Sequence, residues 1–302
     1  MMMQRLDFLL ITKLLLSCGL VGSVAAESTT FVQQKNVVFR EAHGVGLMMD
    51  IFRPVGDHNG KAIVQVVSGG WDSSRSKIRD LEKARVFTTF CGHGYSVFAI
   101  RPGSLSKFSV PEMVENLTAG IVWVKQHASE FGIDAHNLAI VGASAGGHLA
   151  SLVAVQQGRS TGSDDASVAV VGVFFPPTDF SNYGGQSIDP RRRGRFNEIV
   201  RRAAFGDDVV EVSDDEIAAK LKMISPAQQV TANTPPFLIF HGDADLLVPL
   251  QQSEVLLAAL QAHDVPARLV VKSGGGHPWP TIHEEVLQLA DWFDEQLLKE
   301  SP

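Results

Sequence analysis

Short apolar runs alternate with longer amphipathic segments along most of the chain. Near-continuous runs of Val, Ile, Leu and Phe predict strands at residues 62–67, 96–100, 138–141, 169–175, 236–240 and 267–271. Apolar positions spaced for one helical face predict helices near residues 76–91, 111–131, 144–157, 250–263 and 282–298. Strands that are apolar on both faces are typical of a parallel sheet covered by helices on both sides. The alternation therefore predicts an α/β fold with a mostly parallel central sheet.

Two stretches depart from this alternation. Residues 36–40 and 47–53 alternate apolar and polar positions around His43-Gly44-Val45-Gly46, which predicts an antiparallel hairpin at the edge of the sheet. The interval from Pro176 to Pro226 is longer than the crossover that neighbouring parallel strands need. We therefore expect an inserted cap over about residues 177–226.

The predicted cap is locally basic within an acidic protein. Its arginines in this stretch are Arg191, Arg192, Arg193, Arg195, Arg201 and Arg202. Such a run is typical of a solvated surface, and a patch that meets an anionic substrate or polymer is the alternative. The formal charge of the whole chain is −7, and this balance predicts no nucleic-acid partner.

The N-terminal residues follow the pattern of a secretory signal peptide. Arg5 and Lys13 precede a short apolar run that ends in the small residues Val24-Ala25-Ala26, so we expect cleavage after Ala26 and export as a periplasmic or secreted protein. A membrane anchor is the alternative, but the apolar run is shorter than the ~20 residues of a spanning helix. Lipid attachment at Cys18 is a variant, and Leu15-Leu16-Ser17-Cys18 fits a bacterial lipobox only loosely. We expect no stable insertion in a membrane.

Composition bears on the number of domains, the charge of the mature chain, and the prospects for disulfides and metal sites. Residues 27–302 are expected to form one domain, because a chain of 302 residues with 45% apolar content can bury a single large core. Removal of residues 1–26 leaves 24 basic and 32 acidic side chains, a formal charge of −8. Cys91 is then the only cysteine, so no intramolecular disulfide can form. No Cys/His cluster has the spacing of metal ligands, and we expect neither a metal nor a cofactor.

The candidate chemistry begins at Gly142-Ala143-Ser144-Ala145-Gly146. The segment follows the predicted strand 138–141 and opens the predicted helix 144–157, which is the context of a nucleophile elbow. The flanking glycines remove Cβ atoms that would clash in so tight a turn. Ser144 is therefore the candidate nucleophile, and it needs a base and an orienting carboxylate.

Both partners are expected downstream, in the order Ser, Asp, His. Asp245 lies in the loop after the predicted strand 236–240, and Asp243 in the same loop is the alternative, although an Asp there can simply cap the turn. His277 follows the glycines of residues 274–276, after the predicted strand 267–271. His148 and His241 lie beside the elbow and the acid loop, where we expect packing or support rather than catalysis.

A fourth element is a candidate oxyanion hole. The strand 62–67 is followed by Ser68-Gly69-Gly70-Trp71, whose glycine N–H groups can approach a developing negative charge without obstruction. We expect Gly69, Gly70 and Ala145, the residue after the nucleophile, to donate there. Trp71 is expected to contact the substrate.

These motifs resemble the α/β-hydrolase superfamily, in the esterase/lipase branch related to hormone-sensitive lipase and to bacterial acetyl-xylan and feruloyl esterases. The resemblance rests on residues 68–71, 142–148 and 241–249 and on His277, and it extends over roughly residues 36–298. It implies an α/β-hydrolase fold with a small cap. The sequence departs from the branch at Ser68, where His is usual, and at Phe98–Ser104, where Asn-Tyr-Arg is frequent.

The resemblance implies a serine carboxylic-ester hydrolase that acts through a Ser-His-Asp triad and an acyl-enzyme. Its expected substrates are small-molecule or carbohydrate-linked esters. An exported serine peptidase of the prolyl-oligopeptidase type is one alternative, although we expect no room for the propeller domain that usually gates such peptidases. A non-catalytic binding protein on a hydrolase scaffold is the other alternative, and a complete triad disfavours it.

Overall fold

The computed structural model describes residues 30–158, 165–206 and 212–298. The predicted signal peptide and residues 207–211 of the predicted cap lie outside the described residues. The strands are β1 (Phe31–Ala42), β2 (Val45–Pro54), β3 (Ala62–Val66), β4 (Ser96–Ile100), β5 (Leu138–Ala143), β6 (Val170–Phe174), β7 (Phe237–Gly242) and β8 (Ala267–Lys272). The helices are α1 (Arg75–Lys83), α2 (Val86–Gly92), α3 (Val110–Gln126), α4 (Ala128–Phe131), α5 (Ala145–Gln157), α6 (Arg195–Phe205), α7 (Asp214–Met223), η1 (Pro226–Gln228), α8 (Gln251–Ala262) and α9 (Ile282–Leu297).

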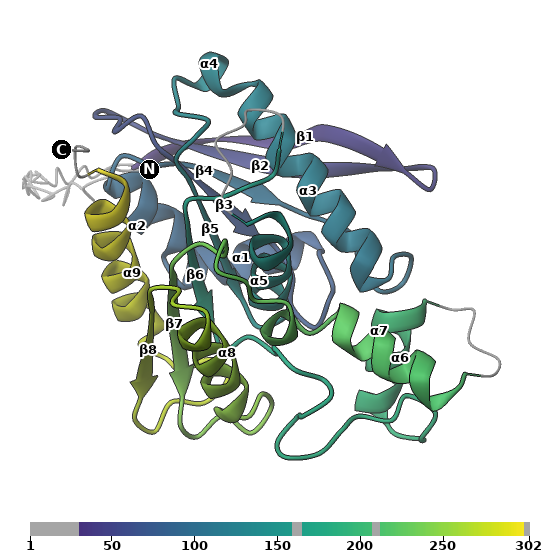
Figure 1. Cartoon of the computed structure of the whole chain (residues 1–302). Helices are drawn as coiled ribbons and strands as arrows, with labels where there is room; N and C mark the ends of the chain where they lie inside the picture. The colour runs from purple at the N-terminus through teal and green to yellow at the C-terminus, as the bar shows by residue number, and fades with distance from the viewer. Residues whose placement is uncertain (1–29, 159–164, 207–211, 299–302) are drawn as a thin grey trace, which may run out of the picture.

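The strands form one sheet in the order β1-β2-β4-β3-β5-β6-β7-β8 (Figure 1). β1 and β2 form the predicted antiparallel hairpin, β2 pairs with β4 antiparallel, and the other pairings are parallel. The predicted α/β-hydrolase fold is confirmed. Because parallel strands end at the same edge, the loops after β3, β5, β7 and β8 meet at the carboxyl edge of the sheet, where such folds place their chemistry.

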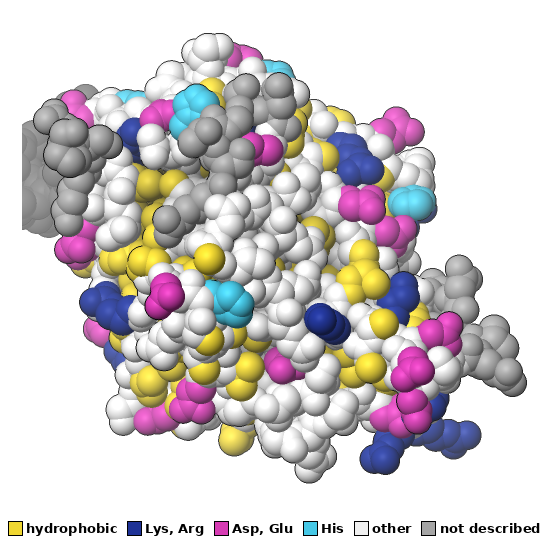
Figure 2. Space-filling view, in the orientation of Figure 1, with side chains coloured by type: hydrophobic (Ala, Val, Ile, Leu, Met, Phe, Trp, Pro, Cys, Tyr) yellow, Lys and Arg dark blue, Asp and Glu magenta, His cyan; other side chains and the backbone are white. Residues whose placement is uncertain are grey.

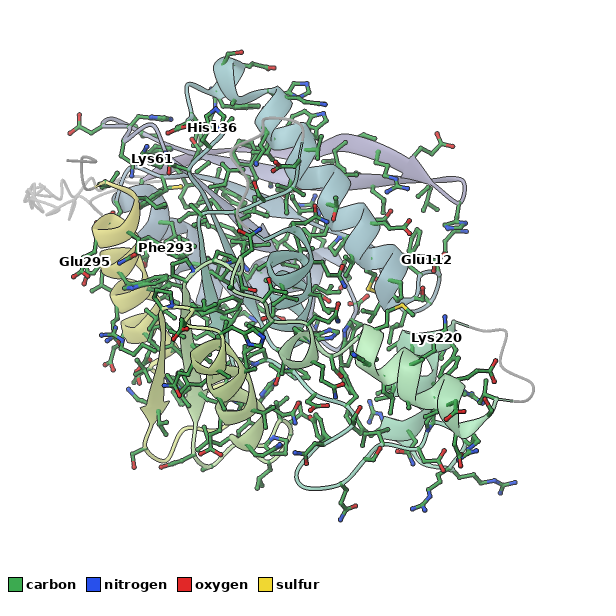
Figure 3. The ribbon with its side chains drawn as sticks, viewed as in Figure 1. Lys61, Glu112, His136, Lys220, Phe293 and Glu295 are labelled. Carbon is green, nitrogen blue, oxygen red and sulfur yellow. The ribbon has the colours of Figure 1, made fainter. Side chains whose placement is uncertain are left out.

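Two apolar clusters explain the continuous hydrophobic runs. Every residue of β3, β4, β6 and β7 is buried, because helices cover both faces of the sheet (Figure 1). One cluster contains side chains of α3, α5 and α8, and the other contains side chains of α1, α2 and α9. On α9, Phe293 points toward the sheet and Glu295 points away from it (Figure 3).

Two predicted helices are each divided in the structure. The segment 76–91 forms α1 and α2, because Arg85 adopts a left-handed backbone with φ 58° and turns the chain between them. The segment 111–131 forms α3 and α4, which meet at His127, whose ring stacks on Trp123 at a centroid distance of 3.9 Å. Neither break coincides with a glycine or proline, so the sequence pattern did not indicate them.

The connection between β6 and β7 contains α6, α7 and η1, where the sequence predicted a cap without assigning helices. α6 and α7 lie side by side on one flank of the molecule (Figure 1). α6 contacts α3, and η1 contacts α5 and α8, so this connection packs on the helices in front of the sheet. Among the described residues, no helix has the length and apolar character required to cross a membrane.

Candidate active site

Ser144 lies at the sharp turn between β5 and α5. Its backbone has φ 53° and ψ −124°, a strained conformation for a residue with a side chain. A Cβ atom on Gly142 would lie 2.2 Å from the carbonyl oxygen of Gly146, and one on Gly146 would lie 2.9 Å from the carbonyl oxygen of Val66. The two glycines therefore permit the close approach of strand and helix that exposes the serine hydroxyl.

The structure brings Ser144, His277 and Asp245 into one hydrogen-bonded chain. Ser144 Oγ lies 2.9 Å from His277 Nε2, and His277 Nδ1 lies 2.6 Å from Asp245 Oδ2. Because a carboxylate can only accept, Nδ1 carries the imidazole proton and Nε2 is left to accept the serine proton. This arrangement can activate a hydroxyl for nucleophilic attack.

Asp245 is buried and fully hydrogen-bonded. Its Oδ1 accepts the backbone N–H groups of Leu247 and Val248 at 2.8 and 2.9 Å. Burial alone would raise the pKa of the Asp245 carboxyl, but hydrogen bonds from His241, His277 and the Val248 N–H outweigh it. The pKa of Asp245 therefore lies below its ordinary value, and the carboxylate stays ionised beside His277 at neutral pH.

Asp243, the alternative acid, has a different position. Its Oδ1 accepts the backbone N–H of Gly274 at 2.6 Å, so it fastens the loop that carries His277. His241 is fully buried, and its ring bonds the Ser253 hydroxyl at 2.6 Å and the Val248 carbonyl at 2.9 Å. This placement agrees with the supporting role expected for His241.

Two of the backbone N–H groups that the sequence predicted as oxyanion donors are not engaged elsewhere in the described residues. Ala145 is the first residue of α5, so its N–H has no partner within the helix. Gly70 lies in the loop after β3 with φ 60°, and no acceptor for its N–H occurs among the hydrogen bonds of the described residues. Both are positions where the sequence predicted donors.

The role expected for Gly69 needs correction. Its N–H donates to the carbonyl of Asp72 at 2.9 Å, and the N–H of Asp72 donates back to Gly69 at 3.2 Å. This two-way bridge closes the loop, so the N–H of Gly69 is engaged and cannot serve an oxyanion without breaking the bridge. Among the described residues, the buried hydroxyl of Ser68 has no hydrogen-bond partner, so the bridge closes the loop without a contribution from that side chain.

The substrate contact expected for Trp71 also needs correction. The side chain is only 5% exposed and lies among core residues. Its indole Nε1–H donates to His148 Nδ1 at 3.0 Å, and its ring is tilted against that of Phe180, with the two ring centroids 6.1 Å apart. The Trp71 side chain therefore anchors the loop after β3 to the core.

One further neighbour of the catalytic candidates is Phe175. This residue has φ 39° and its ring lies 4.3 Å from the His277 ring, between that histidine and Trp279. It belongs to the segment Phe174-Phe175-Pro176-Pro177 at the end of β6. It packs against the imidazole and restricts the ring's orientation.

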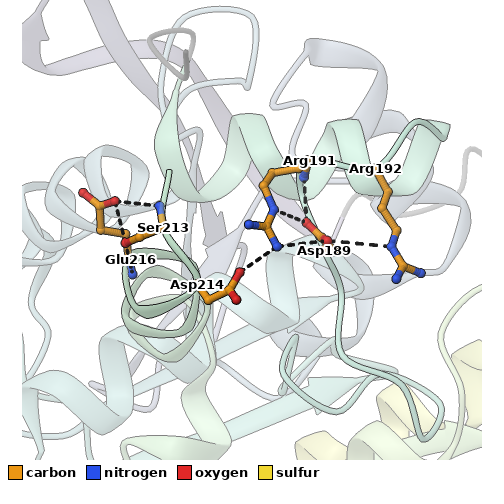
Figure 4. Close-up of polar contacts among 6 residues, drawn as sticks. All are labelled: Asp189, Arg191, Arg192, Ser213, Asp214 and Glu216. Carbon is orange, nitrogen blue, oxygen red and sulfur yellow. Dashed lines mark hydrogen bonds and ion pairs between the residues drawn. The ribbon is translucent and has the colours of Figure 1, made fainter. Parts of the chain in front are cut away.

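The basic stretch after β6 is interleaved with acidic side chains. Figure 2 shows both charge types gathered over α6 and α7. Arg191 pairs with Asp189 at 3.0 Å and with Asp214 at 2.8 Å, and Arg192 lies 3.7 Å from Asp189 (Figure 4). These pairs favour the interpretation as a solvated surface. They neutralise part of the charge that an anionic partner would meet.

Comparison with known proteins places the chain in a family. The BD-FAE family model matches residues 49–260. Esterase LipC of Mycobacterium tuberculosis is 27% identical over 207 residues, which cover 66% of this chain and 48% of that protein. Isoprenylcysteine alpha-carbonyl methylesterase ICME of Arabidopsis thaliana is 26% identical over 172 residues, 56% of this chain and 40% of that protein. The chain thus spans about half the length of the curated relatives it matches.

Solved structures share the fold over nearly the whole chain. A truncated carbohydrate esterase from gut microbiota superposes with a TM-score of 0.77 at 24% identity, covering 91% of this chain and 99% of that one. The butyrate-bound esterase Est2 of Thermogutta terrifontis gives a TM-score of 0.66 at 23% identity, covering 91% and 98%. Together with the family match, these similarities show that the chain is an α/β-hydrolase of the BD-FAE family.

Proposed function

We propose that this protein is a serine carboxylic-ester hydrolase. The observation that carries the proposal is the hydrogen-bonded chain from Ser144 Oγ through His277 to the buried Asp245, at 2.9 and 2.6 Å. The named activities of its relatives, which are carboxylic-ester hydrolases, support the same reaction class.

The proposed reaction begins when Ser144 Oγ attacks the ester carbonyl carbon and its proton passes to His277 Nε2. The N–H groups of Gly70 and Ala145 hold the oxyanion of the tetrahedral intermediate. The bond to the alcohol oxygen then breaks as that oxygen takes the proton from His277, which leaves an acyl group on Ser144. Water gives a proton to His277 and attacks the acyl carbon, and collapse releases the carboxylic acid and reprotonates Ser144. Asp245 holds the imidazole in one tautomer and stabilises its charged form throughout.

We further propose that the substrates are small or carbohydrate-linked esters. The support is the description of two structural neighbours, one a carbohydrate esterase and one an esterase with butyrate bound. The predicted export of the mature chain agrees with an environmental ester as substrate. A panel of p-nitrophenyl esters of increasing acyl length, together with acetylated and feruloylated sugars, would rank these classes by kcat/KM.

The direct test compares wild type with Ser144→Ala on p-nitrophenyl acetate. We expect the variant to lose essentially all turnover while its circular dichroism spectrum is unchanged. Equal rates for the two proteins would overturn the assignment. A proline-containing aminoacyl anilide, assayed in parallel, tests the peptidase alternative, which predicts Ser144-dependent turnover of the anilide.

A further inference from the structure

A buried histidine joins the candidate oxyanion loop to the nucleophile helix. His148 lies on α5, four residues after Ser144, and is fully buried. Its Nδ1 accepts the indole N–H of Trp71 at 3.0 Å. Its own backbone N–H donates to the Ser144 carbonyl at 2.9 Å. One residue therefore contacts both sides of the site, the turn that carries Ser144 and Ala145 and the loop that carries Gly70.

The second ring nitrogen of His148 reaches a third element. Nε2–H donates to the carbonyl of Ile224, at the C-terminal end of α7, at 2.6 Å. Because Nδ1 must accept from an indole and Nε2 must donate to a carbonyl, the ring is held as one neutral tautomer. Burial lowers the pKa of His148 to about 4, although the Ile224 bond opposes this, so the ring keeps this pattern at neutral pH.

The loop that His148 holds is strained. Gly70 and Trp71 are consecutive left-handed residues, with φ 60° and 56°, and this conformation is costly for a bulky side chain. Besides its indole bond, Trp71 accepts the backbone N–H of Leu105 through its carbonyl at 3.0 Å. Without a partner, the buried indole N–H would carry an uncompensated desolvation penalty, and the loop would move to satisfy it. The N–H of Gly70 would move with the loop.

We propose that His148 is a positioning residue that holds the Gly70 N–H at the oxyanion through the Trp71 indole, and that it ties this loop to the β6–β7 connection through Ile224. The inference rests on the proposed function. A positioning role predicts a loss in kcat with little change in KM, because oxyanion donors act mainly on the transition state. A displacement of about 1 Å at such a donor can cost on the order of 10²-fold.

The test uses two variants at His148 and one at Trp71. His148→Leu keeps the volume but removes the acceptor, whereas His148→Asn places Oδ1 near the position of Nδ1 and keeps it. Trp71→Phe removes the indole donor. We expect kcat per folded molecule to fall about 10- to 100-fold in His148→Leu and Trp71→Phe, with KM within about twofold. His148→Asn should recover most of this loss. The double variant that combines His148→Leu with Trp71→Phe should lose no more kcat than either single variant, because both substitutions remove the same hydrogen bond.

Two further readouts separate positioning from folding. The folded fraction, from near-ultraviolet circular dichroism, normalises every kcat. In NMR spectra, the indole N–H resonance of Trp71 is identified by its absence in Trp71→Phe. This resonance should shift in His148→Leu and remain near its wild-type position in His148→Asn. Provided that Ser144→Ala is inactive, either of two results would overturn the inference. One is a normalised kcat within twofold of wild type in His148→Leu and Trp71→Phe. The other is a loss in the double variant that equals the product of the two single losses. If Ser144→Ala is fully active, the proposed function fails and this inference fails with it.

Discussion

Two connections that follow neighbouring strands of the sheet hold aspartates in opposite ways. After β7, Asp245 is buried and bonded to His277, whose side chain is only 12% exposed. After β6, Asp189 is bonded to Arg191, which is 46% exposed and also pairs with an 86% exposed Asp214. Both carboxyls have a lowered pKa, at Asp189 chiefly through the hydrogen bond from Arg191 and at Asp245 through several bonds that overcome burial.

The difference lies in how strongly each geometry is determined. A buried carboxylate with every acceptor site occupied cannot move without leaving polar groups unpaired. An exposed ion pair exchanges its partner for water at little cost. The β7 loop can therefore hold a reactive geometry, whereas the charges after β6 are expected to contribute solubility more than structure.

The largest effect is expected at the proposed nucleophile and the proposed base. Ser144→Ala and His277→Ala should each lower kcat by about 10⁶, because a serine hydroxyl without its base is not activated. Stopped and continuous assays on p-nitrophenyl acetate measure the loss. The two losses should not add in the double variant, and additive losses would mean that the two side chains do not act as a unit.

The next effect separates the two acidic candidates. Asp245→Asn should lower kcat by about 10⁴, since the amide no longer holds the imidazole in the required tautomer. Asp243→Asn is the matched control, and because its amide oxygen can still accept the Gly274 N–H that Asp243 Oδ1 accepts, it should cost less than about tenfold. A larger loss in Asp243→Asn than in Asp245→Asn would reverse the assignment of the acid.

A glycine substitution tests how tightly the nucleophile turn is packed. Gly142→Ala places a Cβ 2.2 Å from a backbone oxygen, and we expect a loss of about 3 kcal/mol in the free energy of unfolding. Gly92→Ala on α2 is the control, because no atom lies within 4 Å of its added Cβ. Urea denaturation of both variants measures the difference. Equal stabilities would show that the turn is looser than its geometry indicates.

The acid dependence of stability tests the hydrogen bonds that lower the pKa of Asp245. Its folded-state pKa lies below its ordinary value of 3.8, so its stabilising contribution is present above that pH and is lost as the pH falls through the folded-state pKa. The free energy of unfolding should therefore fall more steeply below pH 4 in wild type than in Asp245→Asn. Denaturant midpoints at pH 5, 4 and 3 provide the comparison, and parallel curves would indicate that the Asp245 carboxyl gains no net stabilisation from its hydrogen bonds in the folded protein.

The smallest effect is expected in the ion-paired surface after β6. Arg191→Ala removes contacts with Asp189 and Asp214, yet exposed pairs of this kind contribute little. We expect the Tm to change by less than about 2 °C and kcat/KM on a neutral ester to stay within about twofold of wild type. A drop of more than tenfold on an acidic oligosaccharide ester alone would favour the alternative of a patch for anionic substrates.

Local sequence patterns were sufficient to predict the positions of the triad candidates. Ser144 lies between close-packed glycines, and Asp245 and His277 each follow a buried strand, so the order of strands brought all three to one edge. These features depend on a few neighbouring residues and on the parallel sheet. They are visible without knowledge of any long-range contact.

The details that the sequence did not predict depend on partners far along the chain. Trp71 turns inward because His148, 77 residues later, accepts its indole N–H. The N–H of Gly69 turns away from the site because the loop closes on Asp72. The break at Arg85 reflects the packing of α1 and α2 on one apolar cluster, and no residue type there marks a left-handed backbone.

The central claim is that His277 activates Ser144 as a nucleophile. The most direct measurement is peptide mass spectrometry after treatment with a fluorophosphonate probe, which forms a stable adduct only with an activated hydroxyl. The account predicts an adduct on the peptide that contains Ser144 in wild type, with none in Ser144→Ala and strongly slowed labelling in His277→Ala. An unlabelled wild-type protein, or an adduct on a different residue, would contradict it.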